Sequence, residues 1–247
     1  MVYFFYIVAP IGRKGGKMQD EFLKIEPVAH IRTDFSDKFG IPRQAGRVAS
    51  AMGKIVFVPK YRNPDALRGI EGFSHLWLVF DFSKAHREGW SPTVRPPRLG
   101  GNERVGVFAS RSPFRPNPLG LSCVRLERVL STEHEGVVLM VSGVDLLDGT
   151  PIFDIKPYIP FADCRKDAVG GYADEFSLHG LSVDFPEELL LLLPEEKRQA
   201  AADCLREDPR PSYQNDPERI YGMKFAGFDI RFFVDGDKLT VCSVEKL

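Results

Sequence analysis

The stretch VGVFASRSPFRPNPLGLSCVRLERV, residues 105–129, places two runs typical of β-strands on either side of a segment that cannot form one. Its middle, RSPFRPNPLG (111–120), holds three prolines and two arginines. Proline donates no ladder hydrogen bond and fixes φ at about −65°, so this middle segment should form a stiff, irregular loop. The stretch therefore predicts two strands joined by a rigid loop that carries two cations.

Similar strand-like runs fill the first two thirds of the chain. They are rich in Val, Ile, Phe or Leu, are bounded by Gly, Pro, Asn or Asp, and lie at residues 22–33, 46–58, 73–82, 105–109, 121–129, 137–144 and 151–155. Strands this frequent, with few helical stretches between them, favour an antiparallel sheet or barrel over alternating βαβ units. The segment GGNERVG (100–106) lacks the third glycine of a dinucleotide-binding loop at the required spacing, and the sequence contains no P-loop motif.

The pattern changes after Pro160. The segments PEELLLLL (186–193) and PEEKRQAAADCLRED (194–208) predict two short helices, each with a proline at its first position and acids in its first turn. Near the end, FDIRFFVDGDKLTVCSV (228–244) has two alternating runs joined by Asp-Gly, which predicts a β-hairpin.

We therefore expect a mainly β protein: an antiparallel β-barrel domain at residues 22–165 and a smaller C-terminal α+β domain at 166–247. Residues 1–21 are expected to be an N-terminal extension, for which a misplaced start upstream of Met18 is one explanation. The apolar patch at the start has no preceding basic region and no small-residue cleavage site, so it does not read as a signal peptide.

The charge distribution is uneven, although the 247 residues carry a formal net charge of only −1. Residues 87–128 contain eight arginines, no lysine and three acids, whereas residues 174–208 contain ten acids and three bases. Arginine is suited to a bidentate grip on phosphate or carboxylate. The basic middle is thus a candidate anion-binding region, and the acidic section is not expected to face RNA.

The cysteines and histidines give no sign of a metal site. The four cysteines are about forty residues apart, form no CxxC pair and have no neighbouring histidine, so we expect them to be small buried residues of a protein in the reducing cytosol. The five histidines show no ligand spacing, and His75 lies in a strand-like run where a core role is the simpler interpretation. No apolar run is long enough to span a bilayer.

Two Pro-Arg loops are the first candidate functional features. Arg111 and Arg115 lie in the stiff loop, and RPPRLGGNER (95–104) repeats the arrangement with Arg95 and Arg98. Prolines reduce the freedom of the unbound loop, so ordering it around an anion costs less. The alternative is that these arginines brace their loops through surface ion pairs, with Glu103 and Glu127 as partners.

The second feature is DLLDGTPIFDIKPY, residues 145–158. A hairpin turn explains Asp148 and Gly149. It does not explain Asp145 and Asp154, which lie among apolar residues where a carboxylate needs a partner. That partner is either an arginine of the basic middle or a positively charged ligand.

The chain resembles the TsaA-like family. The resemblance rests on PRQ (42–44), GIEGFSHLWLVFDF (69–82), RPPRLGGNERVGVFASRSPFRPNPLGLS (95–122) and DLLDGTPIFDIKPYIPFAD (145–163), in this order, with EDPRPSY (207–213) and the final hairpin. It covers nearly everything from Phe22 to the end. It implies a homodimeric β-barrel methyltransferase that uses S-adenosylmethionine to methylate the exocyclic nitrogen of threonylcarbamoyladenosine beside a tRNA anticodon.

The resemblance also implies residue roles. The family's cofactor contacts correspond here to Pro42, Arg43, Gln44, Phe82, Ser83, Arg111, Leu121, Ser142, Gly143, Val144 and Asp145. At positions 82 and 83 the sequence DFSKAH (81–86) departs from the histidine and polar residue expected there. Carboxylates such as Asp145, arginines such as Arg43 or Arg111, and apolar loop residues match the cation, carboxylate and adenine of this cofactor.

The reaction and its tRNA substrate require further groups. Methyl transfer to nitrogen releases a proton, for which Asp154 and Tyr158 are the candidate catalytic residues. An anticodon loop calls for cations and a stacking surface, and the candidates for tRNA contact are Arg95, Arg98, Phe114 and Arg115.

Two other functions remain open from the sequence. One is a methyltransferase of the same fold that acts on a small molecule or a protein, since fold does not determine substrate. The other is a noncatalytic β-barrel module that binds RNA and no cofactor. Asp145, Asp154 and Tyr158 argue against the second, because RNA binding gives no reason for them.

Overall fold

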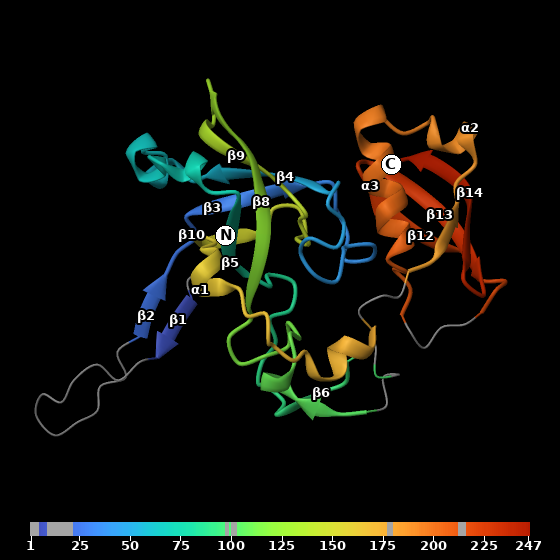
Figure 1. Cartoon of the computed structure of the whole chain (residues 1–247), viewed down its shortest axis with the longest axis horizontal. Helices are drawn as coiled ribbons and strands as arrows, with labels where there is room; N and C mark the ends of the chain where they lie inside the picture. The colour runs from blue at the N-terminus through green and yellow to red at the C-terminus, as the bar shows by residue number, and fades with distance from the viewer. Residues whose placement is uncertain (1–4, 9–21, 97–98, 100–102, 177–179, 212–215) are drawn as a thin grey trace, which may run out of the picture.

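Six strands close into an antiparallel barrel in the computed structural model, which describes residues 5–8, 22–96, 99, 103–176, 180–211 and 216–247 (Figure 1). In barrel order these strands are β10 (Pro151–Pro157), β3 (Ala29–Thr33), β4 (Met52–Phe57), β9 (Gly136–Ser142), β8 (Leu119–Thr132) and β5 (His75–Asp81). Every neighbouring pair is antiparallel. The predicted mainly β fold with an antiparallel barrel is confirmed.

Side chains along the barrel strands alternate between the interior and the outer surface. In β5, Leu76, Leu78 and Phe80 are buried, whereas Trp77 and Val79 are partly exposed. The alternation explains the apolar run that identified this strand in the sequence, and it decides which residues can reach a site inside the barrel and which lie outside.

The C-terminal domain is a four-stranded sheet with short helices beside it. Its strands run in the order β11 (Ser182–Asp184), β14 (Lys238–Lys246), β13 (Phe228–Asp235) and β12 (Tyr221–Phe225). The predicted hairpin at 228–244 is confirmed as β13 and β14. The two predicted helices are α2 (Glu187–Leu190) and α3 (Glu195–Arg206), and their prolines lie at the N-cap, one residue before the expected position.

Several predicted strands have different bounds. The run 22–33 is split into β2 (Phe22–Ile25) and β3, because Pro27 lies between them. The run 46–58 becomes a strand only at β4, since residues 43–51 form turns. The run 105–109 is β7 (Val105–Gly106), paired with β6 (Thr93–Val94), followed by a 3-10 helix, and the unpredicted β1 (Phe5–Val8) pairs with β2.

The remaining helices are short and lie in the connections. The α-helix is α1 (Pro160–Asp163), and the 3-10 helices are η1 (Pro59–Tyr61), η2 (Pro64–Leu67), η3 (Ile70–Gly72), η5 (Val107–Ala109) and η6 (Gly171–Phe176). Within the described parts of the chain, no helix is both long enough and apolar enough to cross a membrane.

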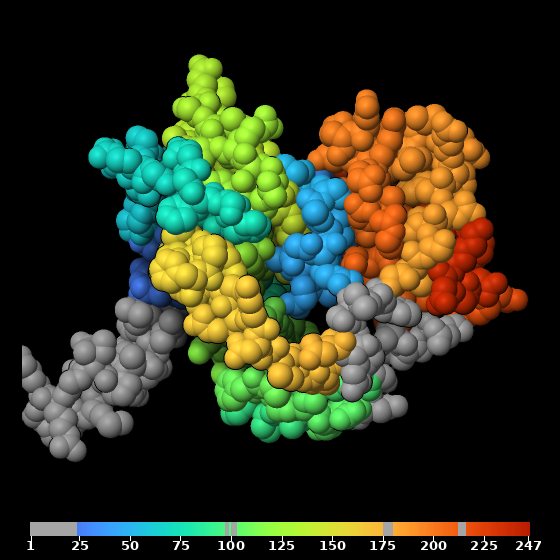
Figure 2. Space-filling view, viewed as in Figure 1, coloured from blue at the N-terminus to red at the C-terminus, as the bar shows by residue number. Residues whose placement is uncertain are grey.

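The connection between β3 and β4, residues 34–51, lies between the barrel and the C-terminal domain (Figures 1 and 2). The Phe35 ring packs 5.4 Å from that of Phe225, and Phe39 stacks on Tyr221 and Phe232. These contacts join the interiors of the two domains into one hydrophobic core. The connection therefore has a fixed position relative to both domains.

Candidate active site

Two glycines bring the β3–β4 connection against the end of β9. The Gly46 amide donates a 2.8 Å hydrogen bond to the Gly143 carbonyl. Gly143 has a φ of +72°, and a Cβ added to it would lie 3.1 Å from Gly46 Cα. Both the left-handed backbone and the close approach require glycine at position 143. This contact places residues 43–47 beside residues 143–145.

Asp145 lies at the centre of this contact. Ser122 Oγ, from β8, donates a 2.6 Å hydrogen bond to Asp145 Oδ1, and the Ala45 amide also donates to the carboxylate. Burial raises the pKa of Asp145, while these hydrogen bonds and the charge of Arg111 act in the opposite direction. The carboxylate is thus partly desolvated and aligned, as a site for a cation requires.

The PRQ segment connects this site to Arg111 and to the C-terminal domain. Arg111 Nη1 donates to Gln44 Oε1, and both residues are exposed. Pro42 is buried. Arg43 Nη2 donates to the main-chain oxygens of Arg210 at 2.9 Å and Asp208 at 3.4 Å, so this nitrogen is already bound within the protein.

The side chains of Ser142 and Val144 are engaged in other contacts. Ser142 Oγ donates a 2.5 Å hydrogen bond to Glu127, and Val144 is fully buried in the barrel core. The main chain is engaged as well: Ser142 is paired with Met52 and with Arg125 in the barrel, and the Val144 amide donates a 3.3 Å hydrogen bond to the Ala51 carbonyl. Glu127 forms its ion pair with Arg125, which is not among the arginines that we expected it to brace.

The predicted contacts at 82 and 83 follow β5 and lie against the Pro-rich loop. The Phe82 amide donates a 2.8 Å hydrogen bond to the Pro118 carbonyl, and Ser83 is exposed. Close in sequence to them, His86 Nε2 lies 2.7 Å from Oδ1 of Asp81, and the Asp81 side chain is 3% exposed. Burial raises the pKa of Asp81, and its hydrogen bond with His86 opposes the shift.

Asp154 and Tyr158 lie on the outer face of the barrel. Asp154 is in register with Val79, and Val79 with Leu121, so Asp154 and the 58% exposed Leu121 share a row about 10 Å apart. Asp154 is half exposed and pairs with Lys156 at 2.8 Å, so the expected partner, an arginine of the basic middle or a charged ligand, is wrong for this residue. The ion pair of Asp154 and the ring contacts of Tyr158 do not include Asp145.

Tyr158 is farther along the same face. Its ring packs against those of His75 and Trp77, at 6.2 and 5.8 Å between centroids. His75 is thus a surface residue in contact with an aromatic ring, where we expected a core residue. Burial, together with nearby Cys164, Cys123 and Asp163, raises the pKa of Tyr158.

The predicted tRNA contacts are only partly visible. Phe114 is 38% exposed, and the Arg87 guanidinium lies 3.7 Å from the centre of its ring. Arg115 Nη1 donates to the Ser110 carbonyl at 3.3 Å, and Arg95 is exposed. Arg98 lies outside the described residues.

Several residues of this region were not predicted. Arg87 and Ser122 are examples, together with the Asp81–His86 pair and two exposed aromatic residues, Trp90 and Phe108. Ser122 and Asp81 had a signal in the sequence, because each is a polar residue at an inward position of an apolar strand. The packing of Arg87 on Phe114 had none, since it joins two different loops. Among the described residues, no three His, Cys, Asp or Glu side chains gather to hold a metal ion.

Comparison with known proteins identifies the family. Residues 30–164 match the tRNA-methyltransferase O N-terminal domain, and residues 179–247 match the TrmO C-terminal domain. The chain is 42% identical to the tRNA (adenine(37)-N6)-methyltransferase of Escherichia coli over 90% of its own length and 97% of the relative's. It is also 42% identical to a putative S-adenosylmethionine-dependent methyltransferase, RcsF, of Pseudomonas aeruginosa, over 84% of this chain and 91% of that protein.

Solved structures agree with these matches. A crystal structure of TrmO from Pseudomonas aeruginosa superposes with a TM-score of 0.70 and 35% identity, over 89% of this chain and 97% of that one. A second TrmO crystal structure gives a TM-score of 0.72 at 34% identity, over 90% and 98% of the two chains. The chain therefore belongs to the TrmO family.

Proposed function

We propose that this protein is an S-adenosylmethionine-dependent tRNA methyltransferase that acts on N6 of adenine 37 when that base carries a threonylcarbamoyl group. The observation that carries the proposal is the near full-length match to the Escherichia coli tRNA (adenine(37)-N6)-methyltransferase. The arrangement around Asp145 supports it independently, because the chemistry of these residues suits the cofactor.

The residues around Asp145 match the three chemical parts of the cofactor. The Asp145 carboxylate suits a cation, either the sulfonium or the ammonium group. Arg111, held by Gln44, suits the amino acid carboxylate. Phe82 and Leu121 offer apolar surface for the adenine, and Ser83, Ser142, Gly143 and Val144 are the further proposed contacts. Pro42 is buried and Arg43 Nη2 donates to the C-terminal domain, so their proposed part is to fix the segment that carries Gln44.

When bound, S-adenosylmethionine supplies the activated methyl group, and the protein must align it with the attacking nitrogen. In-line displacement depends above all on alignment. The Gly46–Gly143 hydrogen bond and the prolines of the 111–120 loop restrict the motion of the residues that surround this site. Rigid loops are therefore the catalytic apparatus of this fold.

The N6 proton must leave when the new bond forms. We propose Asp154 as its acceptor, because its half-exposed carboxylate lies on the same outer row as Leu121. Tyr158 has a raised pKa and stays protonated near neutrality, so its role is that of a relay. Asp154 and Tyr158 are separate from the residues that hold the cofactor, so their roles can be tested separately.

The tRNA is proposed to lie across the arginine-rich loops. Phe114, backed by Arg87, presents a ring face of the kind that stacks on an unpaired base. Arg95, Arg98 and Arg115 are the proposed contacts to phosphate and to the threonine carboxylate. Because the proposed substrate is a tRNA, we also propose a cytoplasmic location.

We further propose a homodimer, as the family resemblance implies. The exposed fractions of Phe108, 75%, and Leu121, 58%, are high for large apolar side chains close to a functional site. Burying such side chains against a second copy would remove apolar surface from water. Light scattering on the purified protein measures the mass directly.

The first experiment uses labelled S-adenosylmethionine and two tRNA preparations, one with threonylcarbamoyladenosine and one without it. We expect label only in the modified tRNA, and nucleoside mass analysis should find the methyl group on that nucleoside. Transfer to neither tRNA, despite cofactor binding, would contradict the tRNA substrate. A protein that binds RNA but no cofactor would be the noncatalytic module.

Asp145→Asn tests the cation site by calorimetric titration of the cofactor without tRNA. We expect affinity at neutral pH to fall by more than about tenfold, because the amide cannot pair with a cation. In the parent protein, affinity should fall on acidification as the carboxylate takes up a proton. The raised pKa of Asp145 moves this loss to a higher pH than for an ordinary aspartate.

Ser122→Ala is the second variant for that titration, and it changes the pKa of Asp145 while keeping the carboxylate. It removes a hydrogen bond that lowers the pKa of Asp145, so the acid loss of affinity should move to still higher pH. Asp145→Asn should abolish the pH dependence altogether. If cofactor affinity still fell on acidification in Asp145→Asn, another group would be responsible for the pH dependence.

Asp154→Asn tests the proton acceptor. We expect turnover to fall about 100-fold, a typical loss for a general base, while the dissociation constants for cofactor and tRNA stay unchanged. Tyr158→Phe should have a smaller effect. Lys156→Met removes the ion-pair partner and keeps the carboxylate, so it serves as control; full turnover in Asp154→Asn would remove Asp154 from the mechanism.

Phe114→Ala tests the stacking surface. Loss of one base–aromatic stack is expected to weaken tRNA binding about tenfold without changing cofactor affinity. Phe73→Ala is the control, because Phe73 is equally exposed, at 39% against 38% for Phe114. Phe73 lies just before the start of β5, whereas the Pro-rich loop that carries Phe114 lies against the residues after its end. Filter binding of modified tRNA measures the affinity of both variants for tRNA. Equal losses of tRNA affinity in the two variants would argue against a specific stack.

A further inference from the structure

Residues 43–47 are held from two sides, by their three middle residues and by their two end residues. Toward the barrel, Gln44 accepts from Arg111, the Ala45 amide donates to Asp145, and the Gly46 amide donates to the Gly143 carbonyl. All of these are contacts with the proposed cofactor site. The side chains of the two end residues, Arg43 and Arg47, contact the C-terminal domain instead.

Residues of the C-terminal domain bind both Arg43 and Arg47. Arg47 makes a bidentate ion pair with Glu207, with Nε 2.8 Å from Oε2 and Nη2 3.0 Å from Oε1. The Glu207 side chain is 15% exposed and that of Arg47 33%, so the carboxylate is the more buried member of the pair. Arg43 donates to the main-chain oxygens of Arg210 and Asp208.

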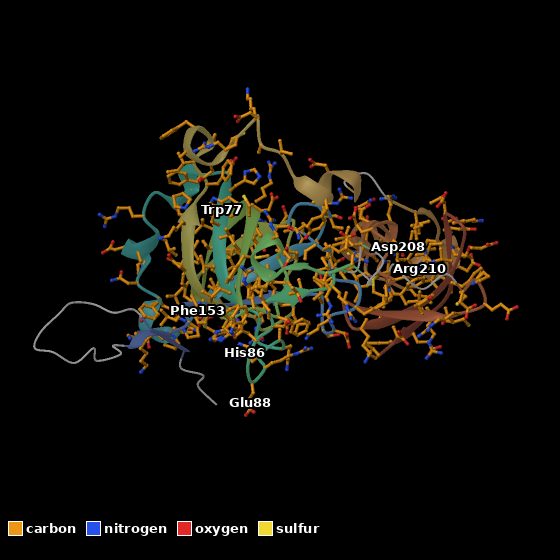
Figure 3. All side chains as sticks on the ribbon, turned by 90° about the horizontal axis from the view of Figure 1, so that it is seen from below. Trp77, His86, Glu88, Phe153, Asp208 and Arg210 are labelled. Atoms are coloured by element: carbon orange, nitrogen blue, oxygen red, sulfur yellow. The ribbon has the colours of Figure 1, made fainter. Side chains whose placement is uncertain are left out.

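The segment that receives Arg43 has hydrogen bonds of its own. Asp208 has a φ of +50°, and its carboxylate forms two hydrogen bonds with the Arg210 guanidinium at 2.9 and 3.0 Å (Figure 3). The Arg210 side chain is 9% exposed, and its hydrogen bonds to Asp208 raise its pKa. The Asp208 and Arg210 side chains thus bind each other, and the main-chain carbonyl groups of the same two residues accept the hydrogen bonds from Arg43.

We propose that the C-terminal domain positions the cofactor loop, with Glu207 and the carbonyls of Asp208 and Arg210 as positioning groups. This inference rests on the proposed function, because it takes Gln44 and Asp145 as cofactor contacts. A loop held in its binding conformation loses less entropy when the ligand binds. Cofactor affinity therefore depends on a domain whose groups act through Arg43 and Arg47.

The chain offers a matched control for this contact. Lys197 Nζ, from α3, lies 2.7 Å from Oδ2 of Asp34, so this ion pair also joins the two domains. Asp34 is 17% exposed, close to the 15% of Glu207, but it lies nine residues before Arg43. Removing it weakens the domain interface and leaves the contacts of residues 43–47 in place.

The experiment compares Glu207→Gln with Asp34→Asn in the full-length protein. Calorimetry without tRNA measures the dissociation constant for S-adenosylmethionine, and thermal unfolding tests the fold. We expect Glu207→Gln to weaken binding about tenfold, within the range of coupling between contacting groups, and Asp34→Asn to change it less than about twofold. Equal losses in the two variants, or none in folded Glu207→Gln, would overturn the proposal.

A double-mutant cycle tests whether Glu207 acts through Arg47. Arg47→Gln should weaken cofactor binding as much as Glu207→Gln, and the double variant should be no weaker than either. Additive losses would contradict the proposed route. Arg47→Gln also tests the contact from the barrel side if Glu207→Gln does not fold. Absence of cofactor binding in the parent protein would instead refute the proposed function.

Discussion

The packing of Phe35 and Phe39 on the C-terminal sheet is the interaction on which the arrangement of the site depends. Both residues lie in the β3–β4 connection, and their burial against Tyr221, Phe225 and Phe232 removes a large apolar area from water. The same connection continues into residues 43–47. A contact that stabilises the domain interface therefore also determines where residues 43–47 lie.

Electrostatics then decides what this loop can bind. Asp145 is partly desolvated, and burial raises its pKa, but Ser122, Ala45 and Arg111 offset part of that effect. The arginines around it are divided between two tasks. Arg43 and Arg47 hold the C-terminal domain, whereas Arg111 is exposed. Arginine serves both because its planar fork binds carboxylates and carbonyl groups in a fixed direction.

Much of the architecture was predictable from local patterns. The strand at 73–82, the final hairpin and the two helices after Pro186 and Pro194 were recognised from alternation, turn residues and helix starts. The run 46–58 was wrong in its first part, because the turns there are imposed by contacts with Gly143 and Glu207, which are distant in sequence. Asp154 was expected to need a cation, and Lys156, two residues away, supplies it.

By itself, the sequence determined the barrel class and the family, because period-two alternation and long motifs are local properties. Only the tertiary structure decided which face each residue occupies and which arginine meets which partner. It placed Asp154 and Tyr158 on the outer face, and it joined Arg47 to Glu207 across 160 positions of the chain. Such pairings depend on how strands close and domains dock, and no short-range pattern encodes them.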